Sequence, residues 1–151
     1  MNHLLLRYIK LIVEPTFEDL KNNPLSPRHT FLACMATYHA IDRAAYRKHP
    51  GNIRKDWCTE SVDFFVVDVV THHIKHVLSD KEEDALIGDG LLLASIKFDD
   101  QKIGPHKDAL AKLLTDQGRL DIKMVPGVVQ NAIRFLLGKA GVSSEYWPAP
   151  V

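Results

Sequence analysis

Hydrophobic and polar residues follow one another with helical spacing along most of this chain, and residues 59–80 give the clearest case. Their apolar positions repeat every three or four residues, which predicts one amphipathic helix. The apolar stripe consists of Val62, Phe65, Val66, Val69, Val70, His73 and Val77. Along one flank of this stripe, Asp68, His72 and His76 follow at four-residue spacing, so they stack on the helix surface. We expect any chemistry of the protein to involve this flank.

Two further amphipathic segments precede this helix. Residues 1–15 predict a first helix that ends at Pro15, and its apolar side is expected to pack on the domain or against a second copy of the chain. Ser26 and Pro27 are a helix start signal, with serine as the N-cap and proline in the first turn. The predicted second helix covers residues 27–49.

The second half of the chain mixes strand and helix signals. Residues 91–98 and 120–125 are short apolar runs that predict the two strands of a small antiparallel hairpin. Residues 105–115 predict a surface helix between them. Pro126 opens the last helix, and Gly138 or Gly141 ends it. The core side of this helix is expected to consist of Val128, Val129, Ala132, Ile133, Leu136 and Leu137. The predicted fold is therefore mainly α, an up-down bundle of about four or five helices with a small β-hairpin before the last helix.

Length and composition fit one globular domain. The chain has 151 residues, of which 46% are hydrophobic and 25% charged, and this is long enough to bury a core. No internal repeat divides the sequence. Residues 1–141 are therefore expected to form a single domain, followed by a proline-rich tail at residues 142–151.

Charge and cysteine content argue against several classes of protein. The 19 Lys and Arg residues equal the 19 Asp and Glu residues, which argues against a DNA-binding domain with a strong basic field. Cys34 and Cys58 belong to no CxxC pair, so a zinc–cysteine site is not expected and a reducing cytoplasm is the expected location. Arg7 and Lys10 interrupt the apolar N-terminal run, which argues against a secretory signal or a membrane span.

The histidines of the central segment suggest a metal site. His72 and His76 are spaced to bind one ion from a single helix face, and Asp68 lies one turn earlier. His39 and Asp42 would complete the set if the two long helices are neighbours, giving ligands suited to zinc, iron, manganese or nickel. The alternative is that these residues hold neighbouring helices in register through hydrogen bonds, without a metal.

Three segments are informative in combination. They are residues 38–42, which read Tyr-His-Ala-Ile-Asp, residues 68–76, with Asp68 at one end and Lys75-His76 at the other, and residues 128–135. This combination resembles bacterial HEPN-like proteins, which are helical bundle domains. The resemblance implies an all-helical homodimer, or an accessory partner of another protein, in a bacterial defence or toxin–antitoxin setting.

The same resemblance implies a second function. Nuclease members of the family carry an Arg followed, after about four to six residues, by a His, and they cut RNA without metal. Arg43 and His49 fit that spacing, and Lys75 with His76 form a second candidate pair. The imidazole would activate the ribose 2′-hydroxyl, and the arginine would stabilise the phosphorane charge. The alternative is a basic helix end, in which Arg47 and His49 offset the helix dipole.

The sequence alone thus leaves three functions open. We favour an interaction module that self-associates or binds a protein partner and needs no cofactor. The alternatives are a metal-independent ribonuclease, which would bind RNA, and a helical bundle that holds a divalent metal. No feature of the sequence indicates a membrane partner.

Overall fold

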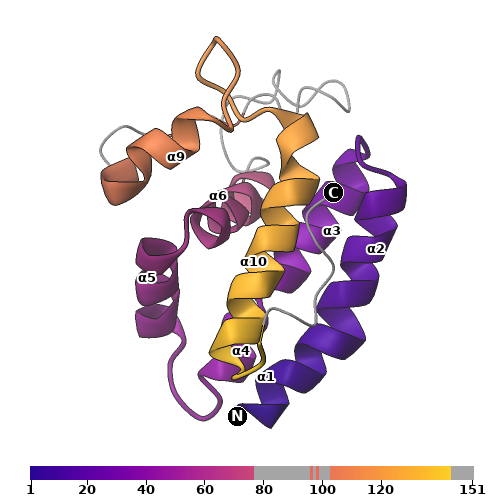
Figure 1. The fold of residues 1–151 in the computed structure, drawn as a ribbon, viewed down its shortest axis with the longest axis vertical. Coiled ribbons are helices and arrows are strands. Elements are labelled where there is room, and N and C mark those ends of the chain that lie inside the picture. The colour runs from indigo at the N-terminus through magenta and orange to yellow at the C-terminus, as the bar shows by residue number, and fades with distance from the viewer. Residues whose placement is uncertain (77–95, 97, 99–102, 144–151) are drawn as a thin grey trace.

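The computed structural model describes residues 1–76, 96, 98 and 103–143, and for residues 74–76 it describes the backbone only. This part of the chain is mainly helical, as predicted, and contains no strand (Figure 1). Its elements are α1 (His3–Tyr8), the π-helical turn η1 (Ile9–Val13), α2 (Glu14–Asn22), α3 (Pro27–Tyr38), α4 (Ala40–Ala44), α5 (Gly51–Glu60), α6 (Val62–His76), the 3₁₀ turn η4 (Gly104–His106), α9 (Lys107–Ala111), the 3₁₀ turn η5 (Ile122–Met124) and α10 (Val125–Lys139).

The first three elements form one continuous helix, which we call the N-terminal rod (residues 3–22). The prediction that Pro15 ends the first helix is wrong. A proline ring clashes with the carbonyl four residues earlier in a regular α-helix. Here the turn just before it is widened, because the Glu14 amide donates to the carbonyl of Ile9, five residues back. The wider turn accommodates Pro15, and the helix continues.

The same π turn keeps one face of the rod on the core. A step of four residues rotates an α-helix by about 40° beyond a full turn, so repeated steps of four drift off one face. The buried positions of the rod nevertheless follow that spacing, and the wide turn lies in their middle. They are Leu5, Ile9, Val13, Phe17 and Leu20. The widened turn absorbs part of the drift and holds these side chains against the core.

The predicted helix over residues 27–49 begins as expected but is interrupted. Ser26 caps α3, because its hydroxyl oxygen accepts from the His29 amide at 3.3 Å. The helix breaks at His39, where α3 gives way to the short α4. Just before the break, the Thr37 hydroxyl donates to the Ala33 carbonyl at 2.7 Å, a bond that tends to bend helices. Two shorter helices therefore replace the predicted long one.

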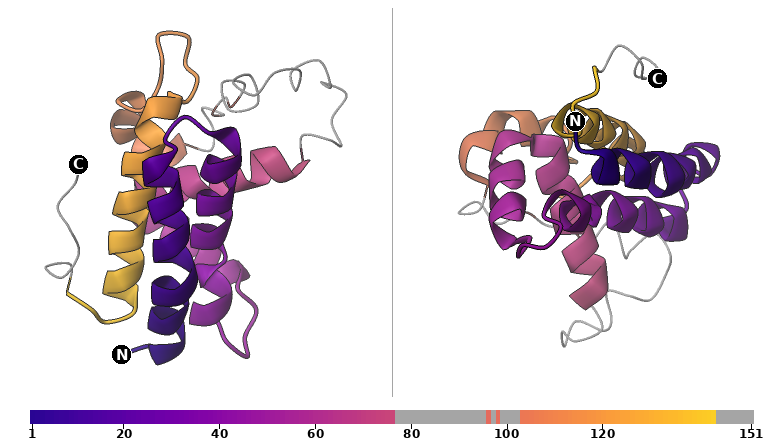
Figure 2. Two further views of the ribbon diagram at one scale, coloured as in Figure 1. Left: turned by 90° about the vertical axis from the view of Figure 1, so that its right-hand side faces the viewer. Right: turned by 90° about the horizontal axis from the view of Figure 1, so that it is seen from below.

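The central helix α6 starts later than residue 59, because residues 51–60 belong to α5. Ser61 is its N-cap, since the Ser61 hydroxyl accepts from the Phe64 amide at 3.1 Å, and the predicted residues 77–80 lie outside the described residues. The buried face of α6 differs from the predicted stripe. Val66 and Val70 are buried as expected, but Val62, Phe65 and Val69 are only half-buried. Deeper positions are taken by Phe64, Val67 and Thr71. The reason is that α6 crosses the other long helices and packs on α3 and α10 at once, so more than one face is covered (Figure 2).

The last helix α10 runs through the core beside the rod and α3 (Figure 1). All six of its predicted core positions are buried, namely Val128, Val129, Ala132, Ile133, Leu136 and Leu137. Its end is also as predicted: Gly141 has a φ of 87°, and the Val142 amide donates to the Leu137 carbonyl at 2.9 Å. A left-handed glycine with this backbone bond is a common helix terminator.

The predicted β-hairpin is not supported. In its second strand, residues 120–125, residues 122–124 form the 3₁₀ turn η5 and Val125 starts α10. The Asp121 carboxylate accepts from the Lys123 amide at 3.1 Å, and this local bond favours a turn over a strand. The described residues of this region keep one isolated antiparallel bridge, between Leu114 and Leu120. The first strand, residues 91–98, lies outside the described residues except for two positions.

The remaining predictions on domain structure are tested only in part. The surface helix predicted over residues 105–115 is present as the shorter η4 and α9. Residues 144–151 lie outside the described residues, so the division into a domain of residues 1–141 and a tail stays a prediction. None of the helices described here has the length and apolar content needed to span a membrane.

Candidate functional site

The contact between α3 and α6 brings four of the polar side chains that the sequence singled out close to one aromatic ring. The ring of Tyr38, the last residue of α3, meets the ring of His72 on α6 edge to face, with centroids 5.0 Å apart. It meets His39 in the same way, at 5.1 Å. We call the group around this ring the Tyr38 cluster, which comprises Tyr38, His39, Asp42, Arg54, Asp68 and His72.

Asp68 is the charged centre of this cluster and is only 8% exposed. Arg54, on α5, donates to both of its carboxylate oxygens, from Nε at 2.8 Å and from Nη2 at 3.2 Å. His72 Nδ1 lies 2.8 Å from the Asp68 backbone carbonyl and 3.3 Å from its carboxylate. The guanidinium of Arg54 also lies 5.8 Å from the centre of the Tyr38 ring. A buried carboxylate is stable only with such partners, so this network fixes α5 against α6.

The other half of the cluster is on the surface. His39 Nδ1 lies 2.8 Å from the Asp42 carboxylate, and both side chains are exposed. The ring of Tyr38 touches His39 and His72 separately. Within the described part of the chain, no three His, Cys, Asp or Glu side chains gather closely enough to hold a metal ion. The His76 side chain is outside that description, so the metal hypothesis stays a prediction.

The two nuclease pairs are placed differently. Arg43 lies over the ring of Tyr8 on the N-terminal rod, 5.4 Å from its centre. His49 instead accepts a hydrogen bond from the Gly51 amide at 3.1 Å, at the start of α5. The two side chains thus engage different elements. Lys75 and His76 form the last described turn of α6, and their side chains lie outside the description.

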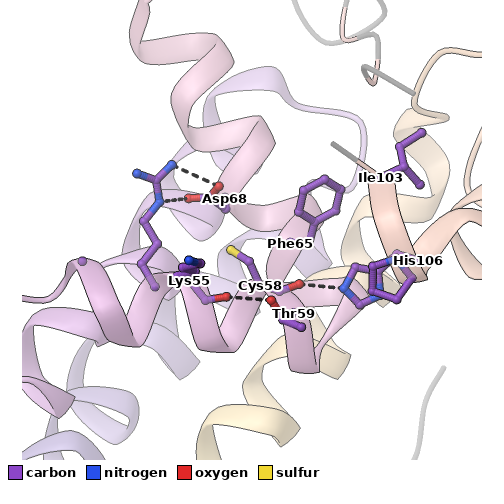
Figure 3. Close-up of a pocket in the computed structure, with 10 residues that line it drawn as sticks. Lys55, Cys58, Thr59, Phe65, Asp68, Ile103 and His106 are labelled. Carbon is purple, nitrogen blue, oxygen red and sulfur yellow. Dashed lines mark hydrogen bonds and ion pairs between the residues drawn. The ribbon is translucent and has the colours of Figure 1, made fainter. Parts of the chain in front are cut away.

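A pocket of about 340 Å³ opens on the other side of Asp68, between α5, α6 and η4 (Figure 3). We call it the α5–α6 pocket. His106 comes to it from far along the chain, and its Nε2 donates to the Cys58 carbonyl at 2.6 Å. The same ring stacks on Phe65, with centroids 5.7 Å apart. Burial, with a smaller effect of the Asp68 charge, raises the pKa of the Cys58 thiol to about 12, so it is uncharged at neutral pH.

A second feature is an exposed apolar surface along the rod, which reaches His39 and Asp42 at one end. Leu11 is 61% exposed and Ile12 is 47% exposed, and Leu4 and Leu32 are also exposed. Two hollows of about 380 and 440 Å³ lie along these side chains and share Tyr8, Ile12 and Arg43 in their walls. We call the exposed apolar surface formed by Leu4, Leu11, Ile12 and Leu32 the rod stripe.

Tyr8 separates the rod stripe from the core. Its hydroxyl donates to the Ala36 carbonyl at 2.6 Å, which ties the rod to α3. Burial of the ring raises the pKa of Tyr8 to about 12. The rod is therefore held firmly, and the leucines beyond Tyr8 face outward from a rigid support.

Sequence reasoning missed three residues of these sites. No spacing along the sequence links Arg54 to Asp68. His106 reaches Cys58 across 48 residues of chain, and no local pattern signals such a contact. Cys58 itself was noted only for the absence of a CxxC partner.

Comparison of the chain with protein-family models, curated proteins and solved structures finds no match.

Proposed function

We propose that the protein is a homodimeric interaction module of the HEPN-like kind, in which two copies pack through the rod stripe. The observation that carries this proposal is the exposure of Leu11 and Ile12 at the middle of a rigid helix. The HEPN-like resemblance suggests the setting, which is bacterial defence or a toxin–antitoxin pair.

The fold does not need the residues of the rod stripe. The rod already places five large apolar side chains in the core, from Leu5 to Leu20. Leu4, Leu11 and Ile12 lie on a different side of the same helix and keep much of their surface in solvent. Contiguous exposed apolar patches on soluble domains usually mark an interaction site. Covering the rod stripe would remove this surface from water.

The charges of the rod favour a second copy as the occupant. Its first half carries the cations Arg7 and Lys10. Its second half carries the anions Glu14, Glu18 and Asp19 and the cation Lys21, which pairs with Glu18, so the second half is acidic overall. A two-fold axis near the middle of the rod would lay two rods antiparallel, with each basic half over the other's acidic half. Lys10 already pairs with Glu14 at 2.7 Å. Arg7 and Asp19 form no ion pair within the described residues, so they remain for the partner.

The length of the rod leaves room for the same arrangement, since a helix of 20 residues spans about 30 Å. Leu11 and Ile12, the most exposed apolar residues of the rod, would lie near the two-fold axis and meet their own copies. Leu4 and Leu32 would extend the apolar contact to either side.

Sedimentation velocity over a concentration series tests the proposal. Wild-type protein is expected to sediment as a dimer, and Leu11→Glu as a monomer, because the introduced charges would meet at the axis. Leu25→Glu is the matched control, since Leu25 is 63% exposed but lies in the turn after the rod. A monomeric wild type, or equal dissociation of both variants, would refute the proposal.

A further inference from the structure

We infer that the α5–α6 pocket binds a small organic monocarboxylate with a flat apolar body, such as an arylacetate. This site is independent of the rod stripe, because α5, α6 and η4 supply its walls. The inference rests on the opposed chemistry of two walls, the net charge between them and the size of the space.

One wall is cationic and has unused donors. Arg54 spends Nε and Nη2 on Asp68, which leaves Nη1 for another acceptor. Lys55, next along α5, lines the same pocket and has no ion-pair partner among the residues that the structure describes. Other polar groups of the wall are already bonded: the Thr59 hydroxyl donates to the Lys55 carbonyl at 3.0 Å, and the Cys58 carbonyl accepts from His106. On this wall, the groups that can still donate hydrogen bonds to a ligand are therefore the guanidinium of Arg54 and the ammonium of Lys55.

The net charge of the pocket lining favours a ligand that carries a single negative charge. Arg54 and Lys55 contribute two positive charges and Asp68 one negative charge, which leaves one positive charge in the lining. The thiol of Cys58 adds none at neutral pH, because burial raises its pKa to about 12. A ligand with one carboxylate would neutralise this positive charge. A phosphate dianion would bring a second negative charge close to the buried Asp68 carboxylate, which disfavours it.

The opposite wall is flat and apolar. Phe65 and His106 stack there with their ring planes 30° apart, and Ile103 lies beside them. Figure 3 shows these three side chains across the pocket from Asp68, with Lys55 on the side of Asp68 and Cys58 between the two sides. A volume of about 340 Å³ is at the lower end for small-molecule sites. A ligand with one ring and one short acid arm matches both the walls and the size.

Isothermal titration calorimetry with phenylacetate tests this inference, and 2-phenylethylamine and phenyl phosphate serve as the cationic and dianionic analogues. Lys55→Gln removes the positive charge and keeps a polar side chain that is one atom shorter. Lys112→Gln is the matched control, since Lys112 is exposed at the end of α9 and does not line the pocket. Circular dichroism melting curves of both variants check that they fold.

We expect saturable binding of phenylacetate, weakened about tenfold in Lys55→Gln and unchanged in Lys112→Gln, because a charge-assisted hydrogen bond is lost. The amine should not bind, and phenyl phosphate should bind more weakly than phenylacetate. No measurable binding of phenylacetate, equal weakening in both lysine variants, or tighter binding of phenyl phosphate would overturn the inference. Because the rod stripe is remote from these substitutions, Lys55→Gln should leave the sedimentation of the protein unchanged.

Discussion

The last helix and the N-terminal rod use apolar residues in different ways. In α10 the large aliphatic side chains point to one side and are buried, from Val125 to Leu137. The rod also buries one side, but it carries a second set of leucine and isoleucine side chains that remain exposed. A helix that only completes a core needs one apolar side. The second side of the rod therefore points to a function outside the fold of the single chain.

The two helices should differ most in how a leucine-to-alanine substitution changes the free energy of unfolding. Leu136 is fully buried in α10, so Leu136→Ala should lower the free energy of unfolding by about 2–5 kcal/mol, through lost burial and a residual cavity. Leu11→Ala should change it by less than about 0.5 kcal/mol at low protein concentration, where self-association contributes least. Urea unfolding of both variants measures this. Similar losses in the two variants would show that the rod stripe belongs to the core.

Alkaline pH provides a second contrast. Burial raises the pKa of Cys34, in the core, from 9.0 to about 12, and that of Tyr8, beside the rod stripe, from 10.0 to about 12. At a pH between the unfolded and the folded pKa, each of these two groups keeps its proton in the folded chain and releases it in the unfolded chain. The stabilisation is complete below pH 9 and is lost as pH rises towards 12, with a slope of about 1.4 kcal/mol per pH unit for each such group.

Urea unfolding between pH 8 and 11 measures this slope. Cys34→Ala should make the loss of stability with pH less steep from pH 9 upward, and Tyr8→Phe should do so only from pH 10 upward. The Tyr8 variant also loses the bond to Ala36, so its stability should be lower than that of the wild type below pH 10, and the difference should shrink above it. A pH profile that neither variant alters would contradict the burial of both groups.

A charge reversal should have a smaller effect, confined to the dimer. Arg7→Glu should raise the dissociation constant about tenfold, because symmetry breaks two surface ion pairs at once. Adding Asp19→Lys to the same chain should restore affinity, since the exchanged charges again face each other. Sedimentation equilibrium measures both variants, with Lys112→Glu as the control. If the double variant dissociates more than Arg7→Glu alone, the two rods are not antiparallel.

The smallest effect is expected on RNA. His49 is engaged at the start of α5, and Arg43 lies over Tyr8, so we expect the protein to leave single-stranded RNA intact in the presence of EDTA. Gel analysis of a labelled RNA after prolonged incubation measures this, with His49→Ala as the matched sample. Cutting by the wild type that His49→Ala abolishes would instead favour the ribonuclease hypothesis.

Features with local causes could be predicted from the sequence. The caps at Ser26, Ser61 and Gly141 depend on neighbouring residues, and all three are present. The core side of α10 follows from simple periodicity, because this helix has one apolar side. The prediction of a strand at residues 120–125 was wrong because this apolar run is short. Over so few residues, periodicity cannot distinguish a strand from the start of a helix.

Features with tertiary causes could not be predicted. The buried face of α6 depends on how this helix crosses α3 and α10. The partner of Asp68 is an arginine from another helix, and the sequence offers no spacing that identifies Arg54. The sequence also indicated an apolar side of the first helix without showing that Leu5 is buried while Leu11 is exposed. Which of these apolar residues are buried depends on how the whole rod packs on the other helices.

Disulfide cross-linking through the rod tests the central claim most directly. In a Cys58→Ala chain, where the remaining Cys34 is buried, Leu11→Cys would place one accessible thiol near the proposed two-fold axis. Mild oxidation should convert this chain to a covalent dimer, while Leu25→Cys in the same background should remain largely monomeric. Equal cross-linking at both positions, or none at residue 11, would contradict a dimer built on the rod stripe.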